Sequence, residues 1–547
     1  MNLIHKFLDR TEYADYADFA ANAKLKVPEK FNYGYDVIDE YARLQPEKRA
    51  LVWCNDKGEE KIFTFKDISL LSNKAANVLY AHGLKKGDII MTMFNRRWEY
   101  WVMAIACHKA GVVIIPATYM LTAKDISYRV NGSGAKALFS INEDSVIKCI
   151  EQAKPDMAND LLYFTLGKRD GYFDFDEELE SASDKFDRVE TDLYDELLIY
   201  FTSGTTGYPK MVAHNHLYPL GHIYNAVFWH EVVDDGLHFT AAETGWAKCS
   251  WGKIYGQWIA GSALFVYDYF GKFTPTDLLK HIPVYKINTF CAPPTIYRFL
   301  IKEDLSQYDL SSLTHCSTAG EALNPEVLKQ FYNATGQLIY EGFGQTESAI
   351  ILGTFKGVDI RPGSMGKPSP LYDIHLFDTD DNDVAVGEVG EVVIKIHHPQ
   401  CGLVYKYHNN EKLTQERLGD GYHRTGDLAY RDEDGYFWFI GRADDIIKSS
   451  GYRIGPFEVE SALQEHPAVL ECAITGVPDP VRGQVVKATI VLAKGYQPSE
   501  ELKKELQNHV KKATAPYKYP RIVEFVTELP KTISGKIRRV EIRNNDK

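Results

Sequence analysis

The chain has 547 residues, is 45% hydrophobic and carries a formal net charge of −13. A chain of this length and composition can bury a large core and should divide into at least two domains. It lacks the apolar run of about 18 residues that a membrane helix requires, and its N-terminal sequence has no apolar segment followed by a small-residue cleavage site. These features argue against a membrane-spanning or secreted protein, and we expect a cytoplasmic one.

Charge is unevenly distributed along the chain. Residues 445–547 carry 17 basic and 13 acidic side chains, a net charge of +4, whereas residues 1–444 carry −17. A surplus of +4 on about a hundred residues is too small to predict nucleic-acid binding, but it suits a compact phosphorylated ligand. The eight cysteines form no CxxC pair, which argues against a zinc site or a disulfide framework.

The first half of the chain alternates apolar strands with helical stretches. One unit runs from a strand at 88–94 through an amphipathic helix at 98–111 to a second strand at 112–117, a right-handed βαβ arrangement. Repeated units of this kind predict largely parallel sheets with helices on both faces. Short strands and turns follow after residue 360 and indicate a β-rich subdomain attached to the α/β body.

The C-terminal residues read as a separate small α+β module. Pro456 opens one helix, which stops before Pro467, and a second helix follows Ser499. We therefore predict an α/β protein in two domains. Residues 1–443 would form a large N-terminal domain of parallel αβα subdomains plus the β-rich subdomain, and residues 444–547 a small mobile α+β domain.

A loop rich in glycine and hydroxyl side chains follows the apolar run "ELLIYF". In "TSGTTGYPK", at 202–210, two glycines let the backbone approach a ligand closely, four threonine and serine hydroxyl groups add donors and Lys210 adds a positive charge. These are the properties of a phosphate-binding loop, although a surface turn can have the same composition. A Walker P-loop is excluded, because a tyrosine and a proline separate Gly207 from Lys210.

Three further motifs accompany this loop: "YEGFGQTES" at 340–348, "HRTGDLAYRDEDGYFWFIGRADDIIKSSGYRIGP" at 423–456 and "LPKTISGKIRR" at 529–539. In their order and spacing the four motifs resemble the adenylate-forming superfamily of acyl-CoA synthetases, luciferases and peptide-synthetase adenylation domains. The resemblance covers nearly the whole chain.

Three other stretches, at 244–258, 449–469 and 479–488, resemble the medium-chain acyl-CoA synthetase branch of that superfamily. In such enzymes a carboxylate attacks the α-phosphate of ATP to give an acyl-adenylate and pyrophosphate, and the thiol of coenzyme A then displaces AMP. The resemblance implies an ATP-dependent, AMP-forming acyl-CoA synthetase for a short or medium-chain, branched or aromatic acid, with ATP, coenzyme A and Mg²⁺ as cofactors.

The resemblance implies that residues from all four motifs form the ATP site. Thr346 would bond an α-phosphate or carboxylate oxygen, Glu347 would hold Mg²⁺, and Lys536 would offset charge repulsion in the first chemical step. Asp427 and Arg442 match the pair that holds the ribose hydroxyls. The other implied positions are Thr202, Ser203, Gly204, Thr205, Thr206, Gly207 and Lys210 around the β- and γ-phosphates, and Glu341, Gly342 and Phe343 at the adenine, with Gly344 and Gln345 from the same motif.

For the second step the resemblance implies that the C-terminal domain rotates about Asp444. The rotation would withdraw Lys536 and bring Gly451 to the site, where it would leave a passage for the pantetheine arm of coenzyme A. Arg453 would then meet a phosphate. The other positions that match the coenzyme A path are Ser450, Tyr452, Arg482, Lys511, Tyr519, Pro520 and Arg521.

The residue at position 344 bears on the choice of acid. Acetyl-CoA synthetases have a tryptophan there, and its indole closes their acyl pocket after a methyl group or so. We therefore expect Gly344 to leave room for a longer or branched acid, with Trp246 and Gly320 at the floor of the pocket and Thr346 nearby. Trp246 by itself is equally well interpreted as a core aromatic.

Two other functions remain open at this point. An adenylating enzyme could pass its acyl group to a carrier-protein thiol, although the matches at Arg482 and 519–521 favour free coenzyme A. A non-catalytic nucleotide-binding protein would be expected to have lost Lys536, Glu347 or Asp427, and all three are present. A homo-oligomer is compatible with the sequence.

The histidines of "VAHNH", His214 and His216, follow the phosphate-binding loop and suggest a metal ligand or a base. No acidic or thiol side chain accompanies them at ligand spacing. We therefore predict ordinary packing or hydrogen bonding for both.

Overall fold

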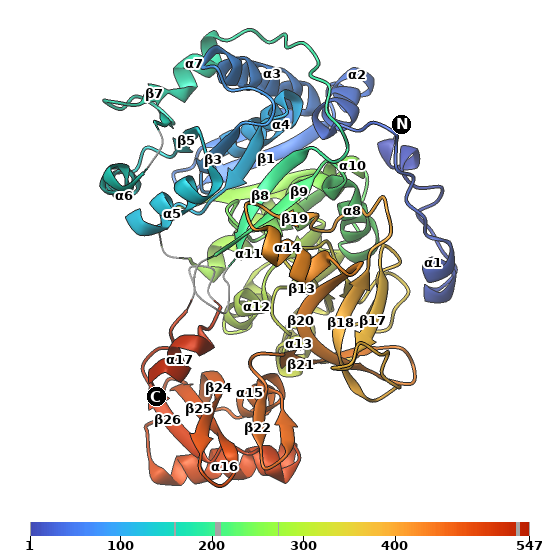
Figure 1. Cartoon of the computed structure of the whole chain (residues 1–547), viewed down its shortest axis with the longest axis vertical. Helices are drawn as coiled ribbons and strands as arrows, with labels where there is room; N and C mark the ends of the chain where they lie inside the picture. The colour runs from blue at the N-terminus through green and yellow to red at the C-terminus, as the bar shows by residue number, and fades with distance from the viewer. Residues whose placement is uncertain (1, 158–159, 203–208, 272, 532–535, 546–547) are drawn as a thin grey trace.

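Most of the chain folds into two mainly parallel β-sheets with their helices, in the upper part of Figure 1. The computed structural model describes all residues except 1, 158–159, 203–208, 272, 532–535 and 546–547. Within the described residues, one sheet has eight strands in the order β19-β9-β8-β4-β3-β5-β6-β7. The other has nine, in the order β16-β15-β14-β13-β12-β10-β11-β1-β2.

The bounds of these strands place Thr202 and Phe343, which belong to the first two motifs, at the ends of β8 and β14. The eight-stranded sheet consists of β3 (Ile89–Met93), β4 (Val113–Pro116), β5 (Ala137–Ser140), β6 (Leu162–Thr165), β7 (Phe173–Asp174), β8 (Glu196–Thr202), β9 (Lys210–Asn215) and β19 (Lys406–Tyr407). The nine-stranded sheet consists of β1 (Arg49–Asn55), β2 (Glu60–Thr64), β10 (Leu237–Thr240), β11 (Ala263–Asp268), β12 (Thr289–Cys291), β13 (His315–Ala319), β14 (Ile339–Phe343), β15 (Leu352–Gly353) and β16 (Lys367–Pro368).

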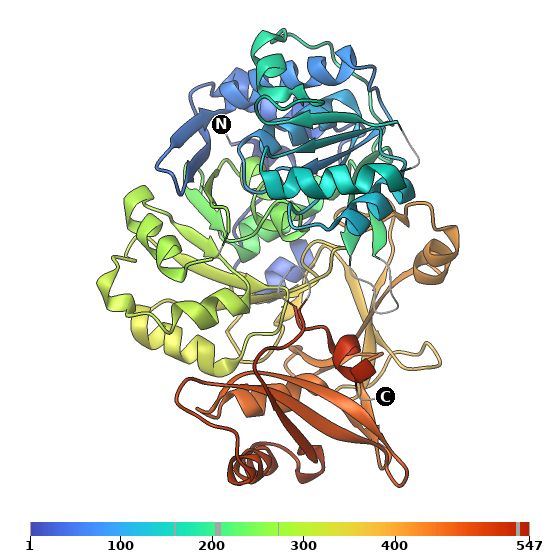
Figure 2. The same cartoon turned by 90° about the vertical axis from the view of Figure 1, so that its left-hand side faces the viewer.

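Helices surround and connect the two sheets (Figures 1 and 2). In chain order the main ones are α1 (Tyr16–Asn22), α2 (Glu40–Leu44), α3 (Phe65–Ala81), α4 (Glu99–Ala110), α5 (Ala123–Ser133), α6 (Asp144–Ala153), α7 (Phe175–Ser181), α8 (Tyr218–Tyr224), α9 (Lys248–Gly252), α10 (Tyr255–Ile259), α11 (Pro275–Tyr285), α12 (Pro294–Leu300) and α13 (Pro325–Thr335). This arrangement is the predicted α/β body.

The βαβ unit predicted at 88–117 is confirmed as β3, α4 and β4, with β3 and β4 parallel. The amphipathic character predicted for the helix is wrong, because every residue of α4 is buried. Its charged side chains are tolerated through partners elsewhere in the chain: Lys109 Nζ donates to Asp39 Oδ1 at 2.6 Å and to Asn73 Oδ1 at 2.7 Å.

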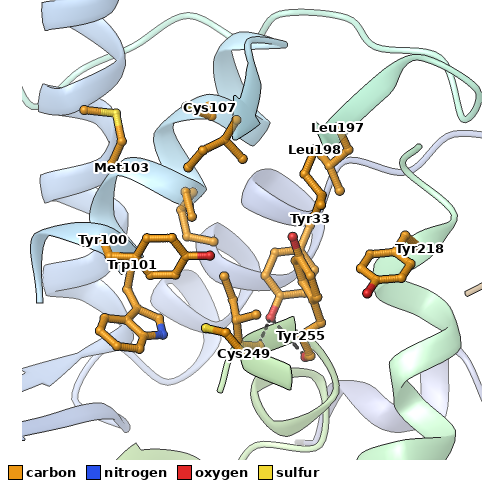
Figure 3. Close-up of a cluster of buried hydrophobic side chains, with 14 of the residues drawn as sticks. Tyr33, Tyr100, Trp101, Met103, Cys107, Leu197, Leu198, Tyr218, Cys249 and Tyr255 are labelled. Atoms are coloured by element: carbon orange, nitrogen blue, oxygen red, sulfur yellow. Dashed lines mark hydrogen bonds between the residues drawn. The ribbon is translucent and has the colours of Figure 1, made fainter. Parts of the chain in front are cut away.

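A single apolar core joins α4 to β8, the strand that precedes the predicted phosphate-binding loop. Figure 3 shows Trp101 and Cys107 of α4, Leu197 and Leu198 of β8, and Tyr255 of α10 around one cluster. The hydroxyl oxygen of Tyr33 lies within hydrogen-bonding distance of the carbonyl oxygens of Ile254 and Tyr255, at 2.8 and 3.0 Å. The junction of α9 and α10 is thus held against this core.

The β-rich subdomain predicted after residue 360 is confirmed. An antiparallel sheet has the order β17-β18-β20-β21, with β17 (Asp373–Phe377), β18 (Val389–Lys395), β20 (Tyr422–Arg431) and β21 (Phe437–Arg442). The short helix α14 (Glu411–Leu418) precedes β20.

The last hundred residues form the small module at the bottom of Figures 1 and 2. Its sheet contains β22 (Ile447–Ser449), β23 (Tyr452–Ile454), β24 (Val469–Asp479), β25 (Gly483–Leu492) and β26 (Ile522–Val526), and its helices are α15 (Pro456–Gln464), α16 (Glu500–Ala513) and α17 (Arg539–Asn545). The helices predicted after Pro456 and Ser499 are confirmed, and the Ser499 side chain caps α16. Asp444, the predicted hinge, lies between β21 and β22.

Candidate active site

A cavity of about 410 Å³ lies where the two large sheets, the β-rich subdomain and the C-terminal module meet. It brings together residues that are more than three hundred positions apart in the sequence. The predicted site residues that line it are Thr202, Lys210, Gly320, Glu341, Gly342, Phe343, Gly344, Gln345, Thr346, Glu347, Asp427, Arg442 and Lys536. Residues Ser203, Gly204, Thr205, Thr206 and Gly207, which were predicted to bind phosphate, lie outside the described residues.

Asp427 and Arg442 face each other across a strand pair. They are register partners on β20 and β21, with Asp427 Oδ1 at 3.5 Å from Arg442 Nη1. Gln345 Nε2 donates to Asp427 Oδ2 at 2.6 Å. Burial raises the pKa of Asp427 to about 6, although the Arg442 guanidinium opposes the shift. The pair offers an ionised acceptor and a guanidinium donor at neutral pH.

Two side chains hold the Thr346–Glu347 turn in place. His214 Nε2 lies 2.9 Å from the Thr346 carbonyl oxygen, and the Tyr407 hydroxyl donates to Glu347 Oε1 at 3.2 Å. Burial lowers the pKa of His214 to about 3, so the ring is neutral and its Nε2–H donates to the carbonyl. The hydrogen-bonding role predicted for His214 is confirmed, and His216 is buried as well.

Glu341 differs from the other carboxylates of the cavity. Its side chain is buried and accepts a hydrogen bond from the Leu323 amide at 3.2 Å. Burial raises the pKa of Glu341 to about 8, so the carboxyl group is mostly protonated at neutral pH and can donate a hydrogen bond. Phe343 and Phe439 form an apolar wall beside it, with ring centroids 6.4 Å apart.

The space expected behind Gly344 is occupied by another part of the chain. A Cβ atom at Gly344 would lie 2.4 Å from Cη2 of Trp251, and one at Gly342 would lie 2.6 Å from the indole of Trp229. Trp251 is held by a hydrogen bond from its Nε1 to the Ser348 carbonyl at 3.0 Å. Glycine at 344 therefore permits close packing of an indole in the direction that a side chain would take, and the room that Gly344 leaves for the acid stays a prediction.

The other two residues predicted at the acyl floor lie in different surroundings. Gly320 lines the cavity with a φ of +101°, and a Cβ there would be 3.1 Å from Lys248 Nζ. Trp246 is half-buried and is not among the described residues that line the cavity. Burial lowers the pKa of Lys248 to about 8, with a further contribution from the charge of Lys536.

Lys536 reaches the cavity from the C-terminal module. Lys536 is one of the residues that line the cavity, and its positive charge acts to lower the pKa of both Asp427 and Lys248. C-terminal to Lys536, the Arg538 amide donates to the Pro530 carbonyl at 2.8 Å. Arg539 then forms a two-pronged pair with Glu460, with Nε–Oε1 and Nη2–Oε2 distances of 3.1 and 2.7 Å.

The residues predicted for coenzyme A cluster elsewhere on the same module. Arg482 Nη1 donates to Ser450 Oγ at 3.1 Å, and Arg521 Nη1 donates to the Tyr519 hydroxyl at 2.8 Å. None of the residues predicted for coenzyme A is among the described residues that line the cavity. The predicted residues are Ser450, Gly451, Tyr452, Arg453, Arg482, Lys511, Tyr519, Pro520 and Arg521. The module is thus posed with Lys536 in the site and these residues outside it.

Several residues at or beside the cavity, among them Tyr407, Trp251 and Arg417, were not predicted from the sequence. Tyr407 orients Glu347, Trp251 packs on Gly344, and Arg417 lines the cavity beside Lys210. Trp251 lies within the 244–258 stretch that carries part of the resemblance, so a signal was present for it. Tyr407 and Arg417 lie outside every motif, and only the pairing of β19 with β9 brings them to the site.

A magnesium ion would find limited protein ligands in this cavity. Among the described residues no group of three or more His, Cys, Asp or Glu side chains is arranged to hold a metal. Glu347 supplies one carboxylate, which fits the way Mg²⁺ is held by one or two carboxylates together with substrate phosphates.

The part of the chain that the structure describes contains no helix with the length and hydrophobicity of a membrane span.

Comparisons with known proteins agree with this geometry. The family model described as AMP-binding enzyme matches residues 38–404, and the AMP-binding enzyme C-terminal domain matches residues 458–536. The chain is 42% identical to human mitochondrial acyl-coenzyme A synthetase ACSM3, covering 98% of this chain and 93% of the relative. It is 44% identical to human mitochondrial acyl-coenzyme A synthetase ACSM5, covering 95% and 91%.

Solved structures give the same result. The anthranilate CoA ligase AuaEII in complex with anthranoyl-AMP has a TM-score of 0.87 at 29% identity, covering 95% of this chain and 98% of that one. A benzoate CoA ligase from Burkholderia xenovorans has a TM-score of 0.81 at 26% identity, covering 94% and 100%.

The curated relatives also overturn one expectation. The chain was expected to be cytoplasmic, but the acyl-coenzyme A synthetases that it matches over more than nine-tenths of their length are mitochondrial proteins, so that prediction is wrong. The predictions of family, fold and reaction are confirmed. The chain belongs to the AMP-binding enzyme family and is an AMP-forming acyl-CoA synthetase.

Proposed function

We propose that the structure represents the adenylate-forming pose of the enzyme. The observation that carries this proposal is that Lys536 lines the same cavity as Thr346, Glu347 and Asp427, while the coenzyme A set of the same module lies outside it. In this pose Lys536 would bring a positive charge to the carboxylate and the α-phosphate, which repel each other as they approach.

In the first step, an oxygen of the acid attacks the α-phosphorus of ATP and the bond to the β-phosphate bridging oxygen breaks, releasing pyrophosphate. Asp427 and Arg442 would hold the ribose, and Thr346 would orient an α-phosphate or carboxylate oxygen. The protonated carboxyl of Glu341 would donate a hydrogen bond to the adenine. Mg²⁺, held by Glu347 and the phosphates, would supply Lewis acidity toward the phosphoryl group.

In the second step, the sulfur of coenzyme A attacks the acyl carbon and the bond to the phosphate oxygen of AMP breaks. We propose that a rotation at Asp444, between the proposed domains 1–443 and 444–547, removes Lys536 and brings Gly451 and Arg453 to the adenylate. The basic residues Arg482, Lys511 and Arg521 would then meet the phosphates of coenzyme A.

For the acid, we propose a compact substrate, either short and branched or aromatic. The indoles of Trp251 and Trp229 fill the space behind Gly344 and Gly342, so a long unbranched chain would meet a wall there. Two similar solved structures are ligases for the flat aromatic acids benzoate and anthranilate.

The experiment is a measurement of AMP and acyl-CoA formation from ATP and coenzyme A across unbranched acids from C2 to C12 with branched and aromatic members. We expect the highest kcat/KM for a branched or aromatic acid. A maximum at an unbranched acid of eight or more carbons would contradict the proposed pocket.

A further inference from the structure

Helix α14 places an arginine at the end of the cavity where the phosphate-binding loop rejoins the sheet. Strand β9 starts at Lys210 and pairs antiparallel with β19, with Tyr407 opposite Val212. The chain that leaves β19 therefore arrives near the start of β9, and α14 begins only four residues later at Glu411. This pairing positions α14 beside Lys210, although the two are about two hundred positions apart in the sequence.

The helix is fixed to β19 by one side chain. The Tyr407 amide donates to Thr414 Oγ1 at 2.9 Å, and the Thr414 hydroxyl lies within hydrogen-bonding distance of the Asn410 carbonyl, at 3.0 Å. Residues three apart on a helix share a face, so Arg417 lies on the same side as Thr414. Arg417 lines the cavity there together with Thr202 and Lys210.

The protein gives this guanidinium few partners of its own. Arg417 Nη1 donates to the Arg424 carbonyl at 3.3 Å, and the nearest ion pair recorded for it is with Glu416, with Nε–Oε1 at 3.7 Å, beyond hydrogen-bonding distance. Its Nε is buried and has no hydrogen-bond partner within the described part of the chain. Among the described residues the Arg424 carbonyl is the only hydrogen-bond acceptor of this guanidinium, so a ligand in the cavity that Arg417 lines could take up its other donors.

Arg417 also acts on its cationic neighbour. The pKa of Lys210 is lowered, first by burial and next by the charge of Arg417, while Glu347 and Glu416 offset part of the shift. Two cations that share a cavity wall repel each other, and an anion bound between them removes that repulsion. A guanidinium offers a flat pair of donors that matches two phosphate oxygens.

We propose that Arg417 binds the β- and γ-phosphates of ATP together with Lys210 and holds pyrophosphate after the first step. The proposal rests on the proposed placement of ATP in this cavity. It assigns Arg417 to the leaving group because Arg417 lines the cavity together with Lys210 and Thr202, although its Nη1 would also lie 3.6 Å from a Cβ at Gly426, next to the Asp427–Arg442 pair proposed for the ribose.

The test compares three ligands on the full-length protein. Dissociation constants for ATP, pyrophosphate and AMP are measured by calorimetry in the presence of Mg²⁺ for the wild type, Arg417→Gln and Arg417→Lys. Lys412→Gln is the matched control, since Lys412 is an exposed cation on the same helix. Losing a charge-assisted contact should weaken ATP and pyrophosphate about 10- to 100-fold in Arg417→Gln.

The affinity for AMP should stay within about twofold, Arg417→Lys should be intermediate and Lys412→Gln unchanged. Equal weakening of AMP and ATP, or unchanged ATP affinity, would overturn the assignment. Wild-type protein that binds neither ATP nor AMP would instead refute the placement of the nucleotide. If Arg417→Gln unfolds below the assay temperature, the Arg417→Lys variant is used instead. The criterion is the same: its affinity for ATP and pyrophosphate should fall more than its affinity for AMP.

Discussion

Replacing Trp251 by phenylalanine should widen the acid specificity at a predictable cost in stability. Cη2 and Cζ2 of the indole lie 2.4 and 2.6 Å from where a Cβ of Gly344 would stand, and the smaller phenyl ring would withdraw from this contact. The substitution also leaves the Ser348 carbonyl without the indole donor that bonds it at 3.0 Å. An unsatisfied buried acceptor costs about 1–3 kcal/mol, so the free energy of unfolding should fall by that amount.

The acid profile should change in a defined direction. Each methylene that the enlarged pocket accepts is worth about 1–3 kcal/mol in transition-state binding, or about 10- to 200-fold in kcat/KM. For two unbranched acids of different length, we divide kcat/KM for the longer acid by kcat/KM for the shorter one. We expect this ratio to be at least tenfold higher in Trp251→Phe than in the wild type.

The matched control is Trp258→Phe. Trp258 is also buried and also donates from Nε1 to a backbone carbonyl, that of Ala50, at 2.8 Å. This variant should lose similar stability, as measured by denaturant unfolding, and keep the wild-type acid profile. A Trp251→Phe enzyme with an unchanged profile, or a Trp258→Phe enzyme with the same altered profile, would refute the reasoning.

Three further predictions concern the first chemical step. Lys536→Ala should slow carboxylate-dependent ATP–pyrophosphate exchange about 100- to 1,000-fold while supplied acyl-adenylate is still converted to thioester; equal loss of both half-reactions would contradict the role proposed for Lys536. Because burial raises the pKa of Asp427 to about 6, its carboxylate is lost as the pH falls through that value, and ATP should bind about tenfold more weakly at pH 5 than at pH 7. Asp427→Asn should remove this dependence between pH 5 and 7, and a slope that persists in the variant would assign it to another group. Glu460→Gln should slow ATP–pyrophosphate exchange more than thioester formation, because it loosens the Arg539 anchor that follows Lys536 in the chain. The control Glu465→Gln changes an exposed residue and should leave both rates unchanged. A parallel loss of both rates in Glu460→Gln would indicate a general defect in folding.

Local sequence signals were sufficient for much of the fold. Alternating apolar segments predicted β3, α4 and β4, and a proline and a serine marked the starts of α15 and α16. The complete burial of α4 could not be predicted, because Lys109 is neutralised by Asp39, seventy positions away. Periodicity reports which faces of a helix are polar, but not whether a distant partner compensates them.

The proposed acid pocket likewise could not be predicted from local sequence alone. The glycine at 344 was visible in the sequence, but its consequence depends on what packs against it. Trp251 reaches it from almost a hundred positions away, since α9 and the loop after β14 converge at the cavity. Arg417 posed a related difficulty, because an arginine in the last turn of a helix is ordinarily explained by the helix dipole. The pairing of β9 with β19 is needed to direct it toward Lys210.

The charge of the C-terminal module gains a spatial explanation under the proposed two-pose mechanism. Among its basic residues, Lys531, Lys536 and Arg539 line the cavity, while Arg482, Lys511 and Arg521 are not among the described residues that line it. A rigid rotation would exchange these groups at one adenylate, so the cation that promotes its formation would be absent when coenzyme A attacks. That exchange has a chemical benefit. A lysine that stayed beside the acyl-adenylate would also promote the reverse of the first step, in which pyrophosphate attacks the adenylate and re-forms ATP. Once the lysine is withdrawn, attack by the thiol of coenzyme A is the favoured reaction.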